Sequence, residues 1–263
     1  MRLGLGLGLY TRRVLGHAQD PVVESWLNRV GPANVSANTK AAVATFVDTM
    51  RAAGLIPKIV RLSLLCGNNL AACLVPLIPG IGPTTDTNVS FTEGQYVENS
   101  GLSGDYGSYL NTKTRFTKAG CIGGMFFQSR NRPTSNRSHI GTTDGSAFFQ
   151  IYHNGSVSKI EGRCGTAASK TSRSITDGAW HAIRTSSTVN KLYNNGVLQD
   201  TNTTLDTSVT PNTDLLVFTS ALPTGFTCNV RMIGYGFDDG TMTDTEAAAY
   251  YAAFEAFNVA LGR

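Results

Sequence analysis

Charged side chains are scarce in this sequence. Only 15% of the 263 residues are Asp, Glu, Lys or Arg, against about a quarter in an average globular chain. A continuous apolar run of about eighteen residues, which a membrane span needs, is also missing. The first sixteen residues lack the small-residue cleavage site of a secretory signal. We therefore expect no membrane partner, and the composition favours a turn-rich β protein over a charge-rich helical enzyme.

Cysteine pairs with the spacing of metal ligands are absent. The five cysteines form no C-x-x-C pair and have no histidine at ligand spacing, so we expect no zinc site; they are Cys66, Cys73, Cys121, Cys164 and Cys228. Their odd number leaves at least one without an internal partner. Cys66 and Cys73 flank an apolar segment and are expected to be buried thiols. A cross-link between neighbouring chains is an open alternative for Cys121, Cys164 and Cys228 in an oxidising setting.

The charge that is present is unevenly distributed. The net charge is only +4, but residues 113–191 carry twelve basic and three acidic groups, whereas residues 192–263 carry two basic and eight acidic groups. The basic segment suits an anionic partner such as an acidic glycan. The alternative is head-to-tail complementarity between copies of this chain.

The first residues, 1–16, read MRLGLGLGLYTRRVLG. Leu3, Leu5, Leu7 and Leu9 alternate with glycine, so one face of an extended segment could add as a strand to the sheet edge of a partner. We predict an extended assembly arm here; a disordered start is the alternative.

A small helical unit is predicted over residues 17–80. Asp20 and Pro21 can begin a helix that Gly31 ends. A second helix extends from Ser36 to Gly54. A short strand or turn and a short helix near residues 68–74 follow, and the Gly-Pro-rich segment IPGIGPTTDTN forms a linker.

Residues 81–242 change to short alternating runs separated by Gly, Asn, Asp and Ser, a pattern typical of an antiparallel β-sandwich. Two hairpins are predicted, with type I′ turns at Asn154-Gly155 and Asn195-Gly196. Residues 243–263 form a closing helix, with Thr243 and Glu246 in a capping box. The fold class is thus mainly β, with helical segments at both ends.

The hairpin region carries a resemblance to a known superfamily. Asp177, Gly178, Trp180 and His181 precede Leu192, Tyr193, Asn195 and Gly196 in the order D-G-x-W-H…L-Y-x-N-G. This order resembles the concanavalin A-like, laminin-G-like jelly roll over roughly residues 84–240. It implies a jelly-roll β-sandwich.

The whole chain is similar to structural proteins carried on tailed-phage particles. The arm, the helical unit, the sandwich and the Ala-rich end TDTEAAAYYAAFEAFNVALGR carry this resemblance, and GLSGDYGSYLNTKTRF (101–116) resembles the segment that opens the sandwich. It implies a virion protein assembled in the host cytoplasm, with other virion proteins and further copies of itself as partners and no nucleic acid.

Catalytic groups in the patterns of this superfamily are missing. Its glycosidases are expected to place carboxylates on one strand as E-x-D-x-(x)-E, and none of the six glutamates does so. Asp238 and Asp239 are adjacent and would face opposite sides of a strand. His181 is expected to be a strand residue with a satisfied ring nitrogen. We predict no enzyme and no catalytic residue. Calcium is a remaining cofactor alternative, with Asp105, Asp144 and Asp177 as turn residues that could bind it.

The best binding candidate is the polar stretch QSRNRPTSNRSH, residues 128–139. Arg130, Asn131, Arg132 and Arg137 provide planar donors for carboxylate, sulfate or phosphate, and Arg163 is a candidate to join them. The alternative is a solvated loop or a subunit contact.

The first functional hypothesis is a structural protein of a phage particle, on the capsid, the neck or the tail. It would attach through its N-terminal part and project a jelly roll. The alternative is a carbohydrate-binding module for an anionic glycan of the host surface, and a glycoside hydrolase or lyase is third.

Overall fold

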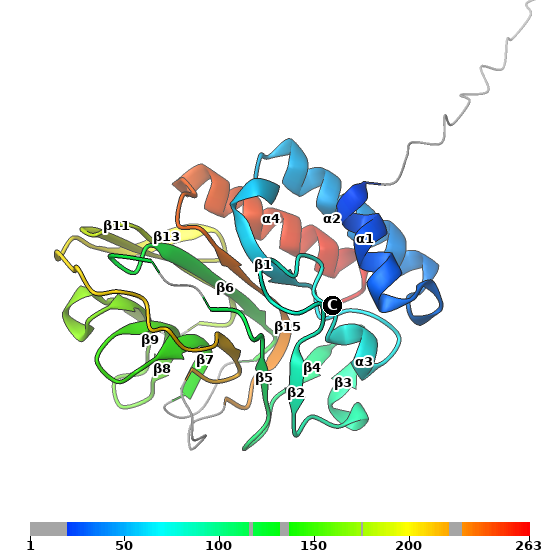
Figure 1. Ribbon diagram of the computed structural model, residues 1–263, viewed down its shortest axis with the longest axis horizontal. Helices are drawn as coiled ribbons and strands as arrows, with labels where there is room; N and C mark the ends of the chain where they lie inside the picture. Colours follow the sequence, from blue (N-terminus) through cyan, green and yellow to red (C-terminus); the bar gives the residue numbers. More distant parts are fainter. Residues whose placement is uncertain (1–19, 116–117, 132–136, 175, 221–227) are drawn as a thin grey trace, which may run out of the picture.

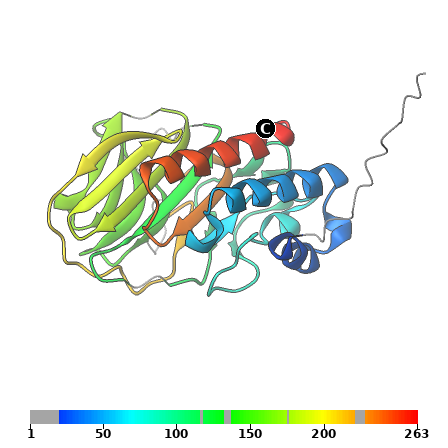
Figure 2. The same ribbon diagram turned by 90° about the horizontal axis from the view of Figure 1, so that it is seen from above.

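The computed structural model describes residues 20–263 except 116–117, 132–136, 175 and 221–227. The described chain forms three layers, in which two antiparallel sheets face each other and helices cover the outer side of one of them (Figures 1 and 2). This confirms the predicted mainly-β sandwich with a small N-terminal helical region and a C-terminal helix.

The first sheet, sheet A, has the strand order β13-β12-β11-β6-β15-β4-β3, and β1 pairs with β15 beside β4. Its strands are β1 (Ile59–Ser63), β3 (Tyr96–Val97), β4 (Gly101–Ser103), β6 (Gly123–Ser129), β11 (Gly178–Ser186), β12 (Val189–Asn194), β13 (Val197–Asn202) and β15 (Arg231–Asp238). Strand β1 lies inside the range predicted as a helical unit, so backbone hydrogen bonds join that range directly to the sandwich.

The second sheet, sheet B, has the order β10-β9-β8-β7-β14-β5-β2. Its strands are β2 (Thr87–Val89), β5 (Tyr109–Asn111), β7 (Arg137–Thr143), β8 (Phe148–Asn154), β9 (Lys159–Gly165), β10 (Thr171–Ser174) and β14 (Leu216–Val217). All of the described pairings in both sheets are antiparallel.

Sheet A is apolar on both faces. In β6, Phe127 points into the sandwich core and Phe126 points to the helices, and both are about 1% exposed. In β11, Trp180 joins the sandwich core while Ala179 and Ile183 join the helical side. A strand buried on two faces loses the alternation of apolar and polar residues, which is why β6 and β11 read as nearly continuous buried runs.

The helices are α1 (Pro21–Val30), α2 (Ala37–Ala52), the short α3 (Leu70–Cys73) and α4 (Asp244–Ala260). Short 3-10 turns occupy Pro32–Asn34, Ile56–Lys58, Glu93–Gln95 and Ala167–Ser169. The predicted caps are confirmed: Asp20 accepts from the N–H of Val22, and Thr243 and Glu246 form the capping box of α4. Among the described residues, none of these helices has the length and apolar character needed to cross a membrane.

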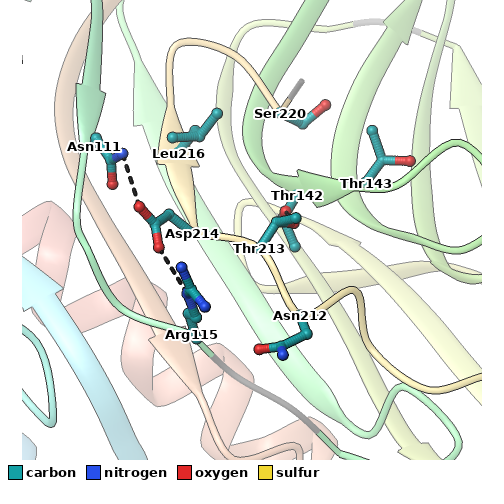
Figure 3. A pocket seen from close by; sticks show the side chains of 9 residues that line it. All are labelled: Asn111, Arg115, Thr142, Thr143, Asn212, Thr213, Asp214, Leu216 and Ser220. Carbon is teal, nitrogen blue, oxygen red and sulfur yellow. Dashed lines mark hydrogen bonds and ion pairs between the residues drawn. The ribbon is translucent and has the colours of Figure 1, made fainter. Parts of the chain in front are cut away.

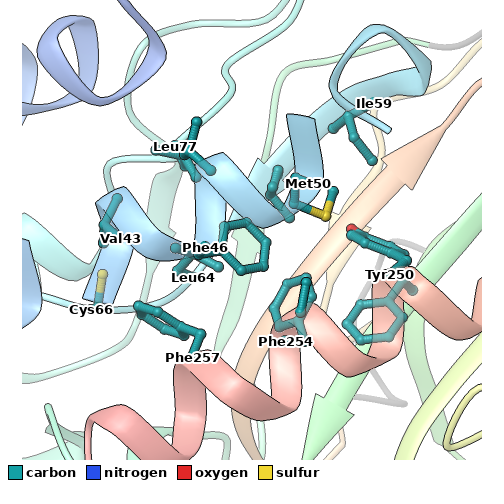
Figure 4. Close-up of a cluster of buried hydrophobic side chains, with 14 of the residues drawn as sticks. Val43, Phe46, Met50, Ile59, Leu64, Cys66, Leu77, Tyr250, Phe254 and Phe257 are labelled. Carbon is teal, nitrogen blue, oxygen red and sulfur yellow. The ribbon is translucent and has the colours of Figure 1, made fainter. Parts of the chain in front are cut away.

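Helices α2 and α4 meet through an aromatic cluster over sheet A (Figure 4). Phe46 of α2 packs edge-on against Phe254 and Phe257 of α4, with ring centroids 5.2 and 5.8 Å apart. Phe254 also lies 4.5 Å from Phe126 of β6. Residues from both ends of the chain therefore share one core with the sheet, on the back of the sandwich.

The two predicted hairpins differ in their turns. Asn195 and Gly196 have φ of 49° and 73°, so the type I′ turn between β12 and β13 is confirmed. The hairpin of β8 and β9 also forms, but the prediction of a type I′ turn at Asn154-Gly155 is wrong. A longer connection intervenes, in which the N–H of Val157 donates to the carbonyl of Asn154 at 3.3 Å and the positive φ of 52° falls on Ser158.

A buried ion pair ties β1 to the rest of the sandwich. Arg61 and Asp86 both have fully buried side chains and lie 2.7 Å apart. The other oxygen of Asp86 accepts from the hydroxyl of Tyr235 on β15, and Arg61 Nη1 donates to the carbonyl oxygens of Pro79 and Pro83 at 2.6 and 3.2 Å. The linker between the helical segment and the sandwich is therefore fixed by side chains from β1 and β15.

We expect Asp86→Asn to lower the free energy of unfolding by about 3–5 kcal/mol, because it leaves the Arg61 charge buried without a counterion. Urea unfolding followed by circular dichroism measures this change. Arg51→Gln is the control, since it breaks an exposed ion pair with Asp20 and should leave the unfolding midpoint nearly unchanged. Equal midpoints for both variants and the wild type would contradict the anchoring role.

His139 should make the fold sensitive to acid. Burial, with a smaller contribution from His153, lowers the pKa of His139 from 6.5 to about 3. The unfolded chain therefore binds a proton below about pH 6.5 that the folded chain does not bind until about pH 3, so stability is full above pH 6.5 and falls as the pH drops through this window. At pH 4.5, two pH units below the unfolded pKa, the loss is about 3 kcal/mol.

His139→Phe removes the titrating group and keeps a ring that can stack on Phe127, 4.3 Å away. We expect the wild type to lose about 3 kcal/mol more unfolding free energy between pH 7 and pH 4.5 than this variant. Urea titrations of both proteins at the two pH values give the comparison. Parallel losses in the two proteins would show that other groups set the acid sensitivity.

Candidate functional site

Within the part of the chain that the structure describes, no helix covers the outer face of sheet B. Helices α1, α2 and α4 all lie on the side of sheet A (Figures 1 and 2). Along β8, Phe149 and Ile151 point into the sandwich core, whereas Gln150 and Tyr152 point outward. This alternation of apolar and polar residues is the pattern of a strand with one wet face.

A central hollow of about 180 Å³ opens on this face, and it is lined by Ser138, Thr143, Gln150, Tyr152, Arg163, Thr219 and Ser220. Its floor is a hydrogen-bonded polar cluster. The hydroxyls of Ser138 and Ser220 lie 2.7 Å apart, and both contact Gln150 Oε1, with Ser138 at 3.2 Å. These three side chains are at most 6% exposed. They are therefore held in fixed positions beneath the opening.

A second hollow of about 290 Å³ adjoins the first (Figure 3). Its lining residues are Asn111, Arg115, Thr142, Thr143, Asn212, Thr213, Asp214, Leu216 and Ser220. Because Thr143 and Ser220 line both hollows, the two lie side by side across β9, β8, β7, β14 and β5. We call them together the sheet-B groove.

Asp214 organises the β5 end of the groove. Its carboxylate accepts from Asn111 Nδ2 and Arg115 Nε, each at 3.0 Å, and Lys113 Nζ lies 3.5 Å away (Figure 3). Burial raises the pKa of Asp214, but the hydrogen bonds from Asn111 and Arg115 and the nearby positive charges outweigh it and lower the pKa below its ordinary value. The carboxylate is therefore ionised at neutral pH.

Glu161 organises the β9 end in the same way. Its carboxylate accepts from Arg163 Nε at 2.7 Å, and from Lys170 Nζ and Asn154 Nδ2 at 3.1 Å. The Arg163 guanidinium also lies over the ring of Tyr152, 4.5 Å from its centroid. Burial raises the pKa of Glu161, but these three donors lower it overall, so this carboxylate is also held ionised.

The structure distributes the predicted binding residues between different surfaces. Arg163 lines the groove. Arg137 lies at the start of β7, where its positive charge opposes the rise in the pKa of Tyr152 that burial causes. Asn131 is instead used near sheet A, where Oδ1 accepts from the N–H of Arg231 at 2.6 Å. Arg130 is exposed next to it, and its N–H donates to the carbonyl of Arg231. Arg132 lies outside the described residues.

The groove residues that sequence reasoning missed include Gln150, Ser220, Asp214 and Arg115. The alternation of FFQIY in β8 was a usable signal for Gln150. Asp214 and Ser220 come from an irregular segment around the two-residue strand β14, and no local pattern places them beside β7 and β8.

The possible cross-link between chains stays a prediction, and the structure places its three cysteines in the core. Cys121, Cys164 and Cys228 are free and 0% exposed. A disulfide to a neighbouring chain would require the core to open, because each sulfur lies inside the sandwich. The prediction that Cys66 and Cys73 are buried thiols is confirmed.

The remaining candidates have these positions. His181 Nε2 lies 2.7 Å from Asp238 Oδ2 between sheet A and α4, so its prediction as a strand residue with a satisfied nitrogen is confirmed. Asp144 acts as a turn residue, accepting from the N–H groups of Ser146 and Ala147 at 2.9 Å. The predicted arm with Leu3, Leu5, Leu7 and Leu9 lies outside the described residues, and the role on a phage particle that depends on it stays a prediction.

Comparison with known proteins supports the fold but identifies no family. No family model and no curated protein matches the chain. Among solved structures, a crystal structure named HCR/D F1240A mutant is similar with a TM-score of 0.53 at 10% identity, over 74% of this chain and 51% of that chain. The binding domain of Paraclostridial Mosquitocidal Protein 1 is similar with a TM-score of 0.50 at 9% identity, over 74% and 52%.

A Trypanosoma rangeli sialidase in complex with sialic acid has a TM-score of 0.49 at 11% identity, over 81% of this chain and 38% of the sialidase. The chain thus spans about four tenths to one half of the length of these proteins. At such low identity the two structures with TM-scores of 0.53 and 0.50 show a likeness of fold alone, which is consistent with the predicted jelly-roll-like β-sandwich.

Proposed function

We propose that this protein is a carbohydrate-binding module that holds a glycan along the sheet-B groove without hydrolysing it. The observation that carries the proposal is the contrast between the two sheets: helices cover the outer face of sheet A, whereas no described helix covers the outer face of sheet B, where a hollow has a floor of buried, mutually hydrogen-bonded polar side chains.

The chemistry of the lining suits sugar hydroxyls. Hydroxyl and amide groups can both donate to and accept from such ligands, and guanidinium groups donate to them; these three kinds of group dominate the two hollows. Side chains locked by mutual hydrogen bonds, as Ser138, Gln150 and Ser220 are, lose little further freedom when a ligand binds. Strands lie about 4.8 Å apart, so the four spacings from β9 to β5 give a groove of roughly 19 Å. That length suits an oligosaccharide rather than a single sugar.

The electrostatics of the two carboxylates favours binding over cleavage. A glycosidase needs one carboxyl group with a raised pKa that donates a proton, opposite a second that is ionised. In the groove, the pKa values of Glu161 and Asp214 are both lowered, and each carboxylate contacts two cations. Neither carboxyl group therefore has the raised pKa that a proton donor needs.

The test is a polysaccharide panel in native affinity electrophoresis, with isothermal titration of the positives, using the full chain. We expect Gln150→Ala and Ser220→Ala each to weaken binding about tenfold, since each removes a hydrogen-bonding group from the floor of the groove. Gln199→Ala is the matched control: it truncates a half-exposed amide on β13 of sheet A and should leave the affinity unchanged.

Two results would contradict the proposal. Binding that is equally weakened by Gln150→Ala and Gln199→Ala would place the site elsewhere. New reducing ends released from a bound polysaccharide, and lost on Glu161→Gln, would make the protein a hydrolase.

A further inference from the structure

The two ends of the sheet-B groove share one charge arrangement. At the β5 end, Asp214 contacts Arg115 at 3.0 Å and Lys113 at 3.5 Å. At the β9 end, Glu161 contacts Arg163 and Lys170, the latter at 3.1 Å. Each carboxylate is thus paired with two cations, which leaves one surplus positive charge at each end.

The exposure of these groups puts the cations toward the solvent. The side chains of Arg115 and Lys113 are 60% and 52% exposed, whereas Asp214 beneath them is 20% exposed. Lys170 is 39% and Arg163 17% exposed, above a Glu161 that is 2% exposed. A ligand that enters the groove therefore meets ammonium and guanidinium groups before it meets a carboxylate.

The donors of Arg115 are suited to an anion. Its described hydrogen bond to Asp214 uses Nε–H, and a guanidinium carries five N–H groups in a planar fork. The two terminal nitrogens can therefore form the paired hydrogen bonds that carboxylate and sulfate accept. Asp214 holds the fork in place for such a ligand.

The surrounding charge acts in the same direction. Residues 113–191, which include Arg115, Arg163 and Lys170 and the strands β7 to β10, carry twelve basic and three acidic groups. A surplus of this size raises the local concentration of anions and their association rate. The Debye length is about 10 Å at 0.1 M salt, so the two ends of a groove roughly 19 Å long attract an anion nearly independently.

We propose, building on the proposed function, that the groove selects an acidic glycan whose carboxylate or sulfate groups bind the cation pairs Lys113–Arg115 and Arg163–Lys170. A polymer with repeating anionic groups can place one charge at each end of the groove, while its hydroxyls meet the central cluster of Ser138, Gln150 and Ser220.

The experiment uses two matched pairs of polymers that differ only in charge. Polygalacturonate is compared with its methyl ester, and dextran sulfate with dextran, each at 50 and 300 mM NaCl. We expect the full chain to bind at least one charged polymer about tenfold more tightly than its neutral counterpart at low salt, and high salt to reduce this preference. Binding of polygalacturonate alone identifies a uronate ligand, and binding of dextran sulfate alone identifies a sulfated one; both outcomes support the inference.

The variants separate the groove from general charge attraction. Arg115→Gln and Lys113→Gln should each weaken binding of the charged polymer about fivefold, and by more than they weaken binding of the neutral counterpart. Arg51→Gln makes the same charge change on α2, away from the groove, and should have no effect. Unchanged thermal unfolding of the exposed-site variants confirms that they are folded.

The failures of the two proposals are distinguishable. Equal affinity for the charged and neutral members of each pair, with Gln150→Ala still weakening both, overturns the acidic-ligand inference and leaves the glycan-binding function in place. Equal losses on Arg115→Gln and Arg51→Gln also overturn the inference. Absence of binding to every charged and neutral glycan overturns both.

Discussion

The burial of sheet A on both of its faces is the constraint on which the other features of the molecule depend. Phe127 and Trp180 supply the sandwich core, and their neighbours Phe126 and Ile183 supply a second apolar face on the same strands. A sheet with two apolar faces must be covered twice, so helices α2 and α4 have to lie on its back. Sheet B has one apolar face and needs no second cover. Its polar side is therefore free to form a groove, and the position of the candidate site follows from the pattern of the strands.

The helical layer is held to the sandwich by buried polar contacts as well as by aromatic packing. Arg61 and Asp86 join β1, the linker and β15, and the guanidinium of Arg263 donates to the carbonyl oxygens of Leu64, Leu65 and other residues. Buried charges of this kind add little net stability compared with apolar replacements, but an arrangement that separates them leaves an uncompensated charge in the core. They act against alternative dockings of the helices on sheet A.

Much of the fold could be predicted from the sequence because its signals are local. The cap at Asp20, the capping box at Thr243 and the turn at Asn195-Gly196 depend on residues a few positions apart. At Asn154-Gly155 the same dipeptide sits in a longer connection, so the composition of a turn does not determine its length. The groove could be predicted only in part. Arg163 was among the candidates, and its partner Glu161 lies two positions away on the same face of β9, so the alternation of KIEGR was a usable signal. Asp214 meets Asn111 and Arg115 only through the pairing of β14 with β5, and register between segments about 100 residues apart leaves no local pattern.

The two carboxylates raise the question of how a groove that contains acidic groups can bind an acidic ligand. A carboxylate beneath a cation pair reduces the local positive potential, which weakens attraction for an anion. It also fixes side chains that are otherwise long and mobile, and immobilising such a side chain on binding costs about 0.5–1.5 kcal/mol. With two cations to each carboxylate, Asp214 and Glu161 provide this order while one positive charge remains at each end. The cations that order the ligand also keep both carboxylates ionised. An arrangement that favours holding an anionic sugar therefore disfavours proton donation to a glycosidic bond, so a single electrostatic arrangement accounts for both the proposed binding and the proposed lack of hydrolysis.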